Sequence, residues 1–519
     1  MGFFQKKVTI FFFGLLVFAA ILVLPTPDSL TPQAQRMLAC SMLMGIWWLG
    51  EAVHISATAL LPLVLFPLLG IMPSGEVASN YGNQLVFLFL GGFMIALAME
   101  KWNFHKRIAM NIIVAFGASP KKIILGFILS TAFLSMWISN TATTMMMLPV
   151  AMALVNQLAV GVRLDGQGGS KTEQKIRSGF GFVMMLAIAY SANIGGVGTL
   201  IGTPPNIVFS GLYKQLFPDQ LEVEFFQWMM LVLPLVVILL ALLWFYLCHW
   251  ISPIQMSSIS FSDDASTLVR SELKALGSMS RAEKYVACVF FVTVCLWIFR
   301  KPIPLGALEI AGWGALFGES KYLHDSTVAM VMGLSLFFFP IDMRQGSELE
   351  GKKEYFVLDW KTVEQGVPWG ILLLFGGGFA LAQGFNKTGL DFWIGSHLLA
   401  IVDWPEWLVV LMICLSVTFL TELTSNTATA TIILPLIGSV AIASGIHPLI
   451  LMIPATLSAS FAFMLPVATP PNAIVFGSGW VTISEMARAG LILNVVIALL
   501  TTFWVSFGVK GFFTEIPQF

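Results

Sequence analysis

A polar Ser-Asn-Thr tripeptide occurs twice in this chain, each time between apolar stretches, as Ser139–Thr141 and as Ser425–Thr427. The two copies lie 286 positions apart, and the same offset relates Pro149 to Pro435. A Thr-Pro-Pro-Asn element follows each copy, at 203–206 and at 469–472, with the offset reduced to 266. Two matched pairs of polar, helix-breaking motifs in one order indicate a chain built from two internal repeats.

The amino-acid composition indicates that most of this chain is surrounded by lipid and not by water. Of its 519 residues 57% are hydrophobic and only 11% are charged, whereas a soluble domain carries about a quarter charged residues. Apolar runs of about 20 residues, long enough to cross a bilayer, recur from end to end. The sequence therefore predicts an all-α integral membrane protein, surrounded by membrane lipid and without a nucleic-acid partner.

No cofactor is expected. The five cysteines and six histidines show none of the spacings of a metal or redox site. The apolar run near Lys6 and Lys7 lacks a clear cleavage site, so it is interpreted as a first transmembrane helix and not as a signal peptide. Nothing in the chain resembles a nucleophile triad, a phosphate-binding loop or a zinc helix.

Eleven transmembrane helices are predicted, with two re-entrant hairpins at 119–160 and 407–443. The predicted spans are 8–24, 37–50, 55–70, 84–100, 179–213, 228–250, 285–299, 326–340, 369–385, 448–480 and 486–509. In domain terms, an N-terminal helix (1–35) precedes a first repeat (36–252), a cytoplasmic amphipathic linker (253–284) and a second repeat (285–519).

The loop charges predict the orientation. With a cytoplasmic N-terminus, 20 of the 27 Lys and Arg residues fall in inside loops, which favours this topology and an extracytoplasmic C-terminus. The span ending at Lys101 then ends inside, while its repeat partner, ending at Lys387, ends outside. The two repeats are therefore predicted to be inverted, which brings equivalent motifs together near the bilayer midplane.

Each Ser-Asn-Thr copy is interpreted as the buried tip of a re-entrant hairpin. The tip would start a helix whose free N–H groups attract an anion, and would follow an arm whose unpaired carbonyls suit a cation. The spans 179–213 and 448–480 are predicted to break at their Pro-Pro pairs, because proline removes a helical donor and frees carbonyls. Asn206 and Asn472 are expected to cap the second half-helices.

Alternatives stand beside each of these interpretations. Polar residues in membrane helices often serve as interhelical hydrogen-bond donors and acceptors, and a Pro-Pro pair is often only a kink. Glu422 has no acidic counterpart, since Met136 occupies the equivalent position of the first repeat. It is interpreted as a hydrogen-bonded structural anchor, with help in holding a cation as the alternative.

These motifs closely resemble the divalent anion/sodium symporter family. The resemblance rests on both Ser-Asn-Thr copies, on Gly202–Asn206, on Ser460–Asn472 and on the Trp-Trp-Leu-Gly-Glu stretch at 47–51. It covers nearly the whole chain, and it implies a homodimeric elevator transporter for dicarboxylates, with sulfate and citrate carriers as relatives. The expected location is a plasma membrane, such as the inner membrane of a bacterium.

The resemblance also implies site residues. The first sodium site would comprise Ser135, Ser139, Asn140 and Gly202, and the second Thr421, Ser425, Asn426 and Ala468. The substrate carboxylates would meet Asn140, Thr141, Thr203, Pro204, Asn426, Thr427, Thr469 and Pro470. Sodium would act as the coupling ion.

The expected function is sodium-coupled import of C4-dicarboxylates such as succinate, malate or fumarate. A sodium-independent dicarboxylate exchanger and a sulfate or citrate symporter of the same fold are close alternatives. A channel or an intramembrane enzyme belongs to another class, and the sequence offers no catalytic pair at membrane depth for the enzyme.

Overall fold

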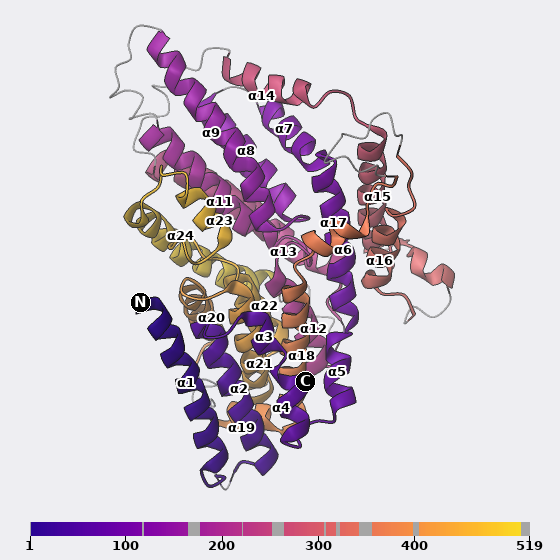
Figure 1. Ribbon diagram of the computed structural model, residues 1–519, viewed down its shortest axis with the longest axis vertical. Coiled ribbons are helices and arrows are strands. Elements are labelled where there is room, and N and C mark those ends of the chain that lie inside the picture. The colour runs from indigo at the N-terminus through magenta and orange to yellow at the C-terminus, as the bar shows by residue number, and fades with distance from the viewer. Residues whose placement is uncertain are drawn as a thin grey trace.

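The fold was determined as a computed structural model, which describes residues 2–27, 29–116, 119–164, 177–220, 222–251, 264–305, 308–317, 322–341, 355–397 and 404–509. It is a bundle of helices drawn out along one axis (Figure 1). Part of the predicted linker 253–284, residues 165–176 and 342–354 between predicted elements, and the C-terminal residues 510–519 lie outside these ranges.

The first half runs from α1 to α13. Its helices are α1 (Gly2–Val23), α2 (Pro32–Gly50), α3 (Ile55–Ala59), α4 (Leu61–Leu68), α5 (Ser74–Tyr81), α6 (Gln84–Lys101), α7 (Phe104–Phe116), α8 (Pro120–Ser135), α9 (Asn140–Leu164), α11 (Phe182–Gly196), α12 (Pro204–Leu216) and α13 (Phe225–Tyr246). Short π-helical segments precede α11 (η1, Arg177–Gly181) and extend α13 (η2, Leu247–Ile251).

Helix α14 (Asp264–Ala275) lies in the predicted linker, and the second half begins after it. Its helices are α15 (Arg281–Ile298), α16 (Asp325–Ser335), α17 (Trp360–Gly366), α18 (Trp369–Thr388), α19 (Leu390–His397), α20 (Glu406–Thr421), α21 (Asn426–Ser444), α22 (Pro448–Ser458), α23 (Pro470–Phe476) and α24 (Ile483–Phe503). A 3₁₀ turn (η4, Trp313–Phe317) and a π-helical end (η7, Trp504–Val509) complete the described helices.

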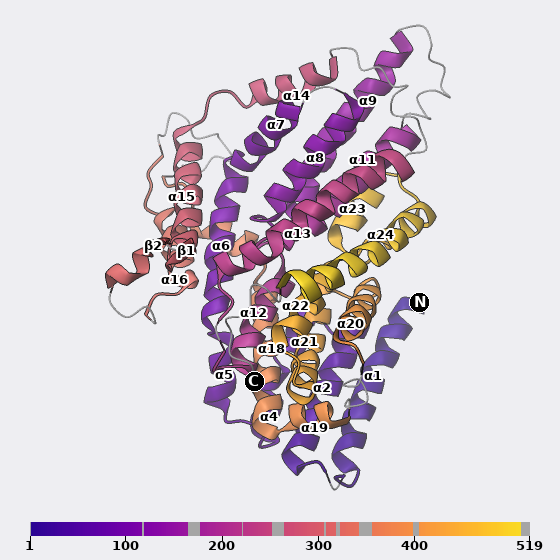
Figure 2. The same ribbon diagram turned by 180° about the vertical axis from the view of Figure 1, so that it is seen from behind.

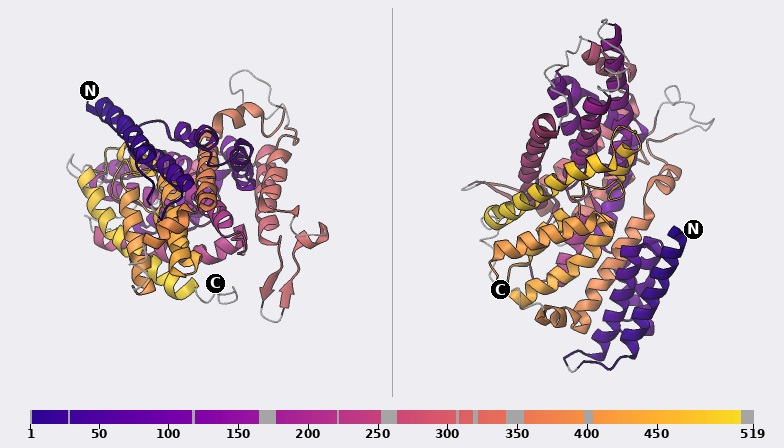
Figure 3. Two further views of the ribbon diagram at one scale, coloured as in Figure 1. Left: turned by 90° about the horizontal axis from the view of Figure 1, so that it is seen from below. Right: turned by 90° about the vertical axis from the view of Figure 1, so that its left-hand side faces the viewer.

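A small antiparallel hairpin interrupts this helical plan. Strands β1 (Ile303–Leu305) and β2 (Leu308–Ile310) pair between α15 and α16, with Ile303 opposite Ile310. The hairpin projects sideways from the bundle (Figure 3). The sequence analysis did not predict it, because three-residue strands give almost no periodic signal.

Two helices of the repeat were also missed. The sequence analysis predicts no helix between the span 84–100 and the hairpin at 119–160, yet the stretch after Lys101 forms α7. This helix is amphipathic, and its basic residues lower the average hydropathy of the segment, so the apolar side does not stand out in the sequence. Helix α19 in the second half begins at Leu390, which is 286 positions after the start of α7 at Phe104. The repeat offset thus extends to helices that the motifs alone did not mark.

The two halves are interleaved around the hairpins. Helices α8 and α9 lie side by side at one end of the molecule, and α1 packs on α2 at the other (Figures 1 and 2). Helix α9 packs against α23, and α12 packs against α21. The second arm of each hairpin therefore contacts the short broken helix of the opposite half.

Seven helical stretches in the described part of the chain are long and apolar enough to cross a membrane. They begin at Lys6, Ser74, Gly179, Phe225, Trp369, Asn426 and Ile483. Three shorter apolar stretches, 55–68, 406–421 and 448–458, fall below that length. The larger number of eleven spans stays a prediction.

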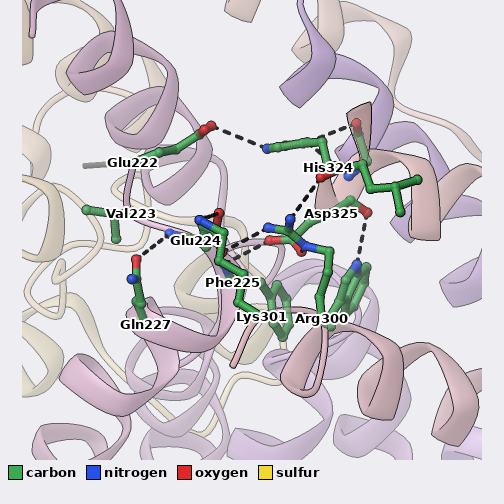
Figure 4. A network of polar contacts seen from close by, with 12 residues as sticks. Glu222, Val223, Glu224, Phe225, Gln227, Arg300, Lys301, His324 and Asp325 are labelled. Carbon is green, nitrogen blue, oxygen red and sulfur yellow. Dashed lines mark hydrogen bonds and ion pairs between the residues drawn. The ribbon is translucent and has the colours of Figure 1, made fainter. Parts of the chain in front are cut away.

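A buried charge cluster joins the start of α13 to α15 and α16 (Figure 4). Arg300, just after α15, pairs with Asp325 at 2.7 Å and with Glu224 at 2.9 Å, and its side chain is 4% exposed. Burial opposes the charge of this guanidinium, but the two carboxylates outweigh it and raise the pKa of Arg300. The Asp325 carboxylate also accepts the backbone N–H of Phe225. Because a buried charge without its partner is strongly destabilising, this cluster fixes α13 against α15 and α16.

Candidate functional site

Both Ser-Asn-Thr copies lie at the turn of a helical hairpin, as predicted, but Ser139 is exposed and Asn140 and Ser425 are half-buried, so the tips are less buried than predicted. Helix α8 ends at Ser135 and α9 begins at Asn140, while α20 ends at Thr421 and α21 begins at Asn426. The first arms, α8 and α20, have 16 residues each. They rise about 24 Å, which is less than the roughly 30 Å hydrocarbon core of a bilayer. Arms of this length favour tips that end within the membrane.

One hydrogen-bond pattern occurs in both tips. The hydroxyl of Ser135 lies 2.5 Å from Asn140 Oδ1 and 2.8 Å from the carbonyl oxygen of Ala192. The hydroxyl of Thr421 lies 2.8 Å from Asn426 Oδ1 and 3.0 Å from the carbonyl oxygen of Ala459. In each half a hydroxyl at the end of the first arm therefore positions the asparagine that starts the second arm.

Neutral oxygen atoms crowd the first tip. A methyl group added to Gly196 would collide with Asn140 Oδ1, so only glycine leaves this space. A methyl group on Gly202 would collide with the Gly196 carbonyl and lie 2.9 Å and 3.0 Å from the carbonyl oxygens of Ser135 and Met136. Carbonyl, amide and hydroxyl oxygens are the ligands of hard cations. The structure thus brings the predicted residues Ser135, Asn140 and Gly202 together.

The second tip repeats the core of this arrangement with differences at its edge. The Ser139 hydroxyl accepts the N–H of Ala142 and caps α9, whereas Ser425 makes no such bond at the start of α21. There, the hydroxyl groups of Thr424 and Thr429 form a hydrogen bond of 2.6 Å instead. Ala468 is the counterpart of Gly202 in the second half. It is buried in the second break, and its N–H donates to the carbonyl oxygen of Leu465.

The tips also differ in exposure. Trp137 of the first tip is buried and meets Phe290 of α15 edge-on, with ring centroids 5.0 Å apart. Its repeat counterpart, Leu423, is 72% exposed. Aromatic packing therefore covers the first tip on its α15 side, whereas the equivalent residue of the second tip is exposed.

The predicted role of Asn206 and Asn472 as caps is wrong. The amide group of Asn206 donates to the carbonyls of Val197 and Thr199, and that of Asn472 to those of Ala462 and Leu465. Each side chain thus points back across its break and satisfies carbonyls that the missing helical turn leaves free. The N-cap positions belong to Thr203 and Thr469.

Four helix N-termini begin at predicted substrate residues. Asn140 and Asn426 start α9 and α21, and Thr203 and Thr469 directly precede α12 and α23. N-termini carry partial positive charge that favours an anion. Because Pro204 and Pro470 begin the two short helices, these contribute their dipoles with few free N–H groups.

The two halves meet through a residue that the sequence analysis missed. Asn193 Oδ1 accepts from Asn140 Nδ2 at 3.5 Å, and Asn193 Nδ2 lies 3.3 Å from Thr469 Oγ1. In the described part of the chain, no hydrogen bond joins the side chains of Asn140 and Thr141 directly to those of Asn426 and Thr427. An asparagine in the apolar run 182–196 was the signal available, since a buried polar group needs partners.

Glu422 is an anchor in this structure. Its carboxylate accepts the backbone N–H groups of Phe463, Met464 and Leu465 and the side-chain amide of Asn494. All four partners belong to the second break or to α24. The carboxylate therefore holds the second tip against the break, in agreement with the interpretation that the sequence analysis favoured.

Hairpin tips, helix breaks and four helix N-termini around neutral oxygens define a secondary transporter. The chain belongs to the family described as the sodium:sulfate symporter transmembrane region, whose model matches residues 5–509. A relative from Staphylococcus saprophyticus, named a sodium-dependent dicarboxylate transporter, is 40% identical over 95% of this chain and 90% of its own. A relative of the same name from Staphylococcus aureus is 40% identical over 94% and 88%. The predicted family is confirmed.

Solved structures share the fold at low identity. The Alcanivorax borkumensis YdaH transporter matches with a TM-score of 0.54 and 12% identity over 84% of this chain and 87% of its own. Neisseria gonorrhoeae MtrF matches with a TM-score of 0.51 and 12% identity over 93% and 96%. Both likenesses concern the fold alone.

The anchor role of Glu422 is testable. Glu422→Gln places an NH₂ group opposite the Leu465 N–H, which Glu422 Oε2 accepts. We expect a lower thermal unfolding temperature in detergent, from a loss of about 1–3 kcal/mol. The sodium concentration that gives half of the maximal stabilisation should stay as in wild type.

Glu364→Gln, at an exposed position of α17, is the control and should change neither quantity. An unchanged unfolding temperature together with a strongly raised sodium requirement would show instead that Glu422 helps to hold the cation.

Proposed function

We propose that this protein is a sodium-coupled symporter that imports C4-dicarboxylates such as succinate, malate or fumarate. The observation that carries the proposal is the matched pair of tips. In each tip, a hydroxyl donates to the side-chain oxygen of an asparagine that lies among other neutral oxygens. The printed names of the staphylococcal relatives support the choice of sodium and dicarboxylate.

The proposed ligands follow the chemistry of the two tips. The first sodium ion is assigned to Ser135, Ser139, Asn140 and Gly202, and the second to Thr421, Ser425, Asn426 and Ala468. The dicarboxylate is assigned to the helix N-termini at Asn140, Thr141, Thr203, Pro204, Asn426, Thr427, Thr469 and Pro470.

The coupling has an electrostatic cause. No Lys or Arg is a hydrogen-bond partner of these residues in the described part of the chain. Helix dipoles, amide and hydroxyl donors, and sodium itself must then balance the charge of the substrate. Binding of the anion and of sodium is therefore mutually dependent, and the dependence is reciprocal.

The proposed transport cycle is an elevator movement. The hairpins and broken helices pack on one another across the two halves, which suits a unit that moves as one body. The proposal includes a homodimer, a cytoplasmic N-terminus and an extracytoplasmic C-terminus, in a plasma membrane such as the inner membrane of a bacterium.

Orientation is tested by cysteine labelling in intact cells. Lys361 and Lys387 are both exposed, and the loop charges place them on opposite sides. A membrane-impermeant thiol reagent should label Lys387→Cys from outside and reach Lys361→Cys only after the cells are opened. Labelling of both from one side would contradict the inverted repeats.

Sulfate is the second candidate substrate, because the description of the family names it. Competition by sulfate or citrate against labelled succinate separates these anions. Uptake without sodium but with internal dicarboxylate would indicate an exchanger. Flux that does not saturate would indicate a channel.

The tips are tested by two matched variants in proteoliposomes. Asn140→Ala and Asn426→Ala each remove a carbonyl oxygen for sodium and an amide donor for a carboxylate. Each should raise the sodium concentration for half-maximal succinate uptake by about tenfold or more, the equivalent of 1.4 kcal/mol. Met145→Leu, on an exposed side chain of the same hairpin, is the control and should behave like wild type.

If both alanine variants kept the sodium dependence of wild type and lost only succinate affinity, sodium would bind elsewhere. The site assignment would then be wrong while the family membership stood.

A further inference from the structure

Asn193 is a fully buried polar residue near the C-terminal end of α11. Its amide contacts both halves of the protein. Its Oδ1 accepts from Asn140 Nδ2 of the first tip at 3.5 Å. Its Nδ2 donates to the Ala462 carbonyl at 3.0 Å and lies 3.3 Å from Thr469 Oγ1, both in the second break. One side chain therefore connects the first tip with the start of α23.

Within the described ranges, this link exists on one side of the repeat only. Because the Ser135 hydroxyl contacts the Ala192 carbonyl and the Thr421 hydroxyl contacts that of Ala459, the following residues, Asn193 and Ser460, are equivalent. The Ser460 hydroxyl is buried and has no hydrogen-bond partner among the residues that the structure describes.

The Thr469 hydroxyl is the receiving end of this link. Its oxygen accepts the N–H of Asn472 at 3.4 Å and faces the Asn193 amide as a second donor. A hydroxyl has two acceptor positions and one hydrogen. With both acceptor positions used by donors of the protein, the hydrogen of Thr469 is left to donate to an anion.

We propose that Asn193 is a positioning residue that couples sodium binding at the first tip to substrate binding at Thr469. This inference rests on the proposed function. A cation held by Asn140 Oδ1 fixes the Asn140 amide, and its Nδ2 then fixes Asn193. Asn193 in turn orients the Thr469 hydroxyl toward a carboxylate of the substrate.

Equilibrium binding measures this coupling directly. The dissociation constant of radiolabelled succinate is determined for the purified full-length protein at saturating and at low sodium, with choline as replacement. The ratio of the two constants is the coupling factor. A purely structural defect weakens binding at both sodium concentrations and leaves this ratio unchanged.

Asn193→Ala should reduce the coupling factor by about fivefold or more. Asn193→Ser, which places the residue of the equivalent position there, should give the same loss and serves if the alanine variant fails to fold. Ser460→Ala is the matched control and should stay within about twofold of wild type, since its hydroxyl has no partner to lose.

A wild-type coupling factor in the folded Asn193 variants would overturn the proposal, as would an equal loss of affinity at both sodium concentrations. If sodium had no effect on succinate binding by the wild-type protein, the proposed function itself would fail. The wild-type measurement thus separates the two failures.

Discussion

The proposed site depends on one hydrogen bond, which a hydroxyl at the end of the first hairpin arm donates to the side-chain oxygen of an asparagine at the start of the second arm. It occurs once in each half, from Ser135 to Asn140 and from Thr421 to Asn426. It directs the side-chain oxygen of each asparagine toward the surrounding carbonyls, where a bound cation can hold it. The same hydroxyls lie against carbonyls of α11 and of the residue after α22, at Ala192 and Ala459. One atom in each half therefore ties tip, break and asparagine together.

The breaks create the polar surface that the tips use. The helical ladder ends at Gly196 in α11 and at Ser458 in α22, and it resumes only at Pro204 and Pro470. The buried carbonyls of each break must therefore find donors elsewhere in the protein. Asn206 and Asn472 supply them from the far side of each break. Thr199 adds a second connection, because its hydroxyl contacts the Met136 carbonyl of the first tip. The breaks are thus rigid, hydrogen-bonded structures, which suits a preformed binding site.

Sequence reasoning located the tips, the breaks and the repeat because each depends on local chemistry. The sequence alone shows the spacing of 286 between the Ser-Asn-Thr copies and of 266 between the Thr-Pro-Pro-Asn copies. It also shows the helix-breaking prolines. The roles of Asn193 and Asn206 were missed or mistaken, because the partner of a buried amide is set by helices that pack across the two halves. Helix α7 and the β1–β2 hairpin were missed because mixed charge and short length mask their periodicity. Long-range pairing, such as Arg300 with Glu224, leaves no mark in sequence spacing.

The space beside Gly196 gives the most direct test of the oxygen cluster at the first tip. Gly196→Ala adds one methyl group that would collide with Asn140 Oδ1, while Gly75→Ala adds the same group where, beyond its own helical turn, no atom of the described residues lies within 4 Å. Sodium binding to the purified protein is measured by titration at a fixed succinate concentration. The account predicts at least about a tenfold weaker sodium affinity for Gly196→Ala and an unchanged affinity for Gly75→Ala. Wild-type sodium affinity in a folded Gly196→Ala protein would contradict the account.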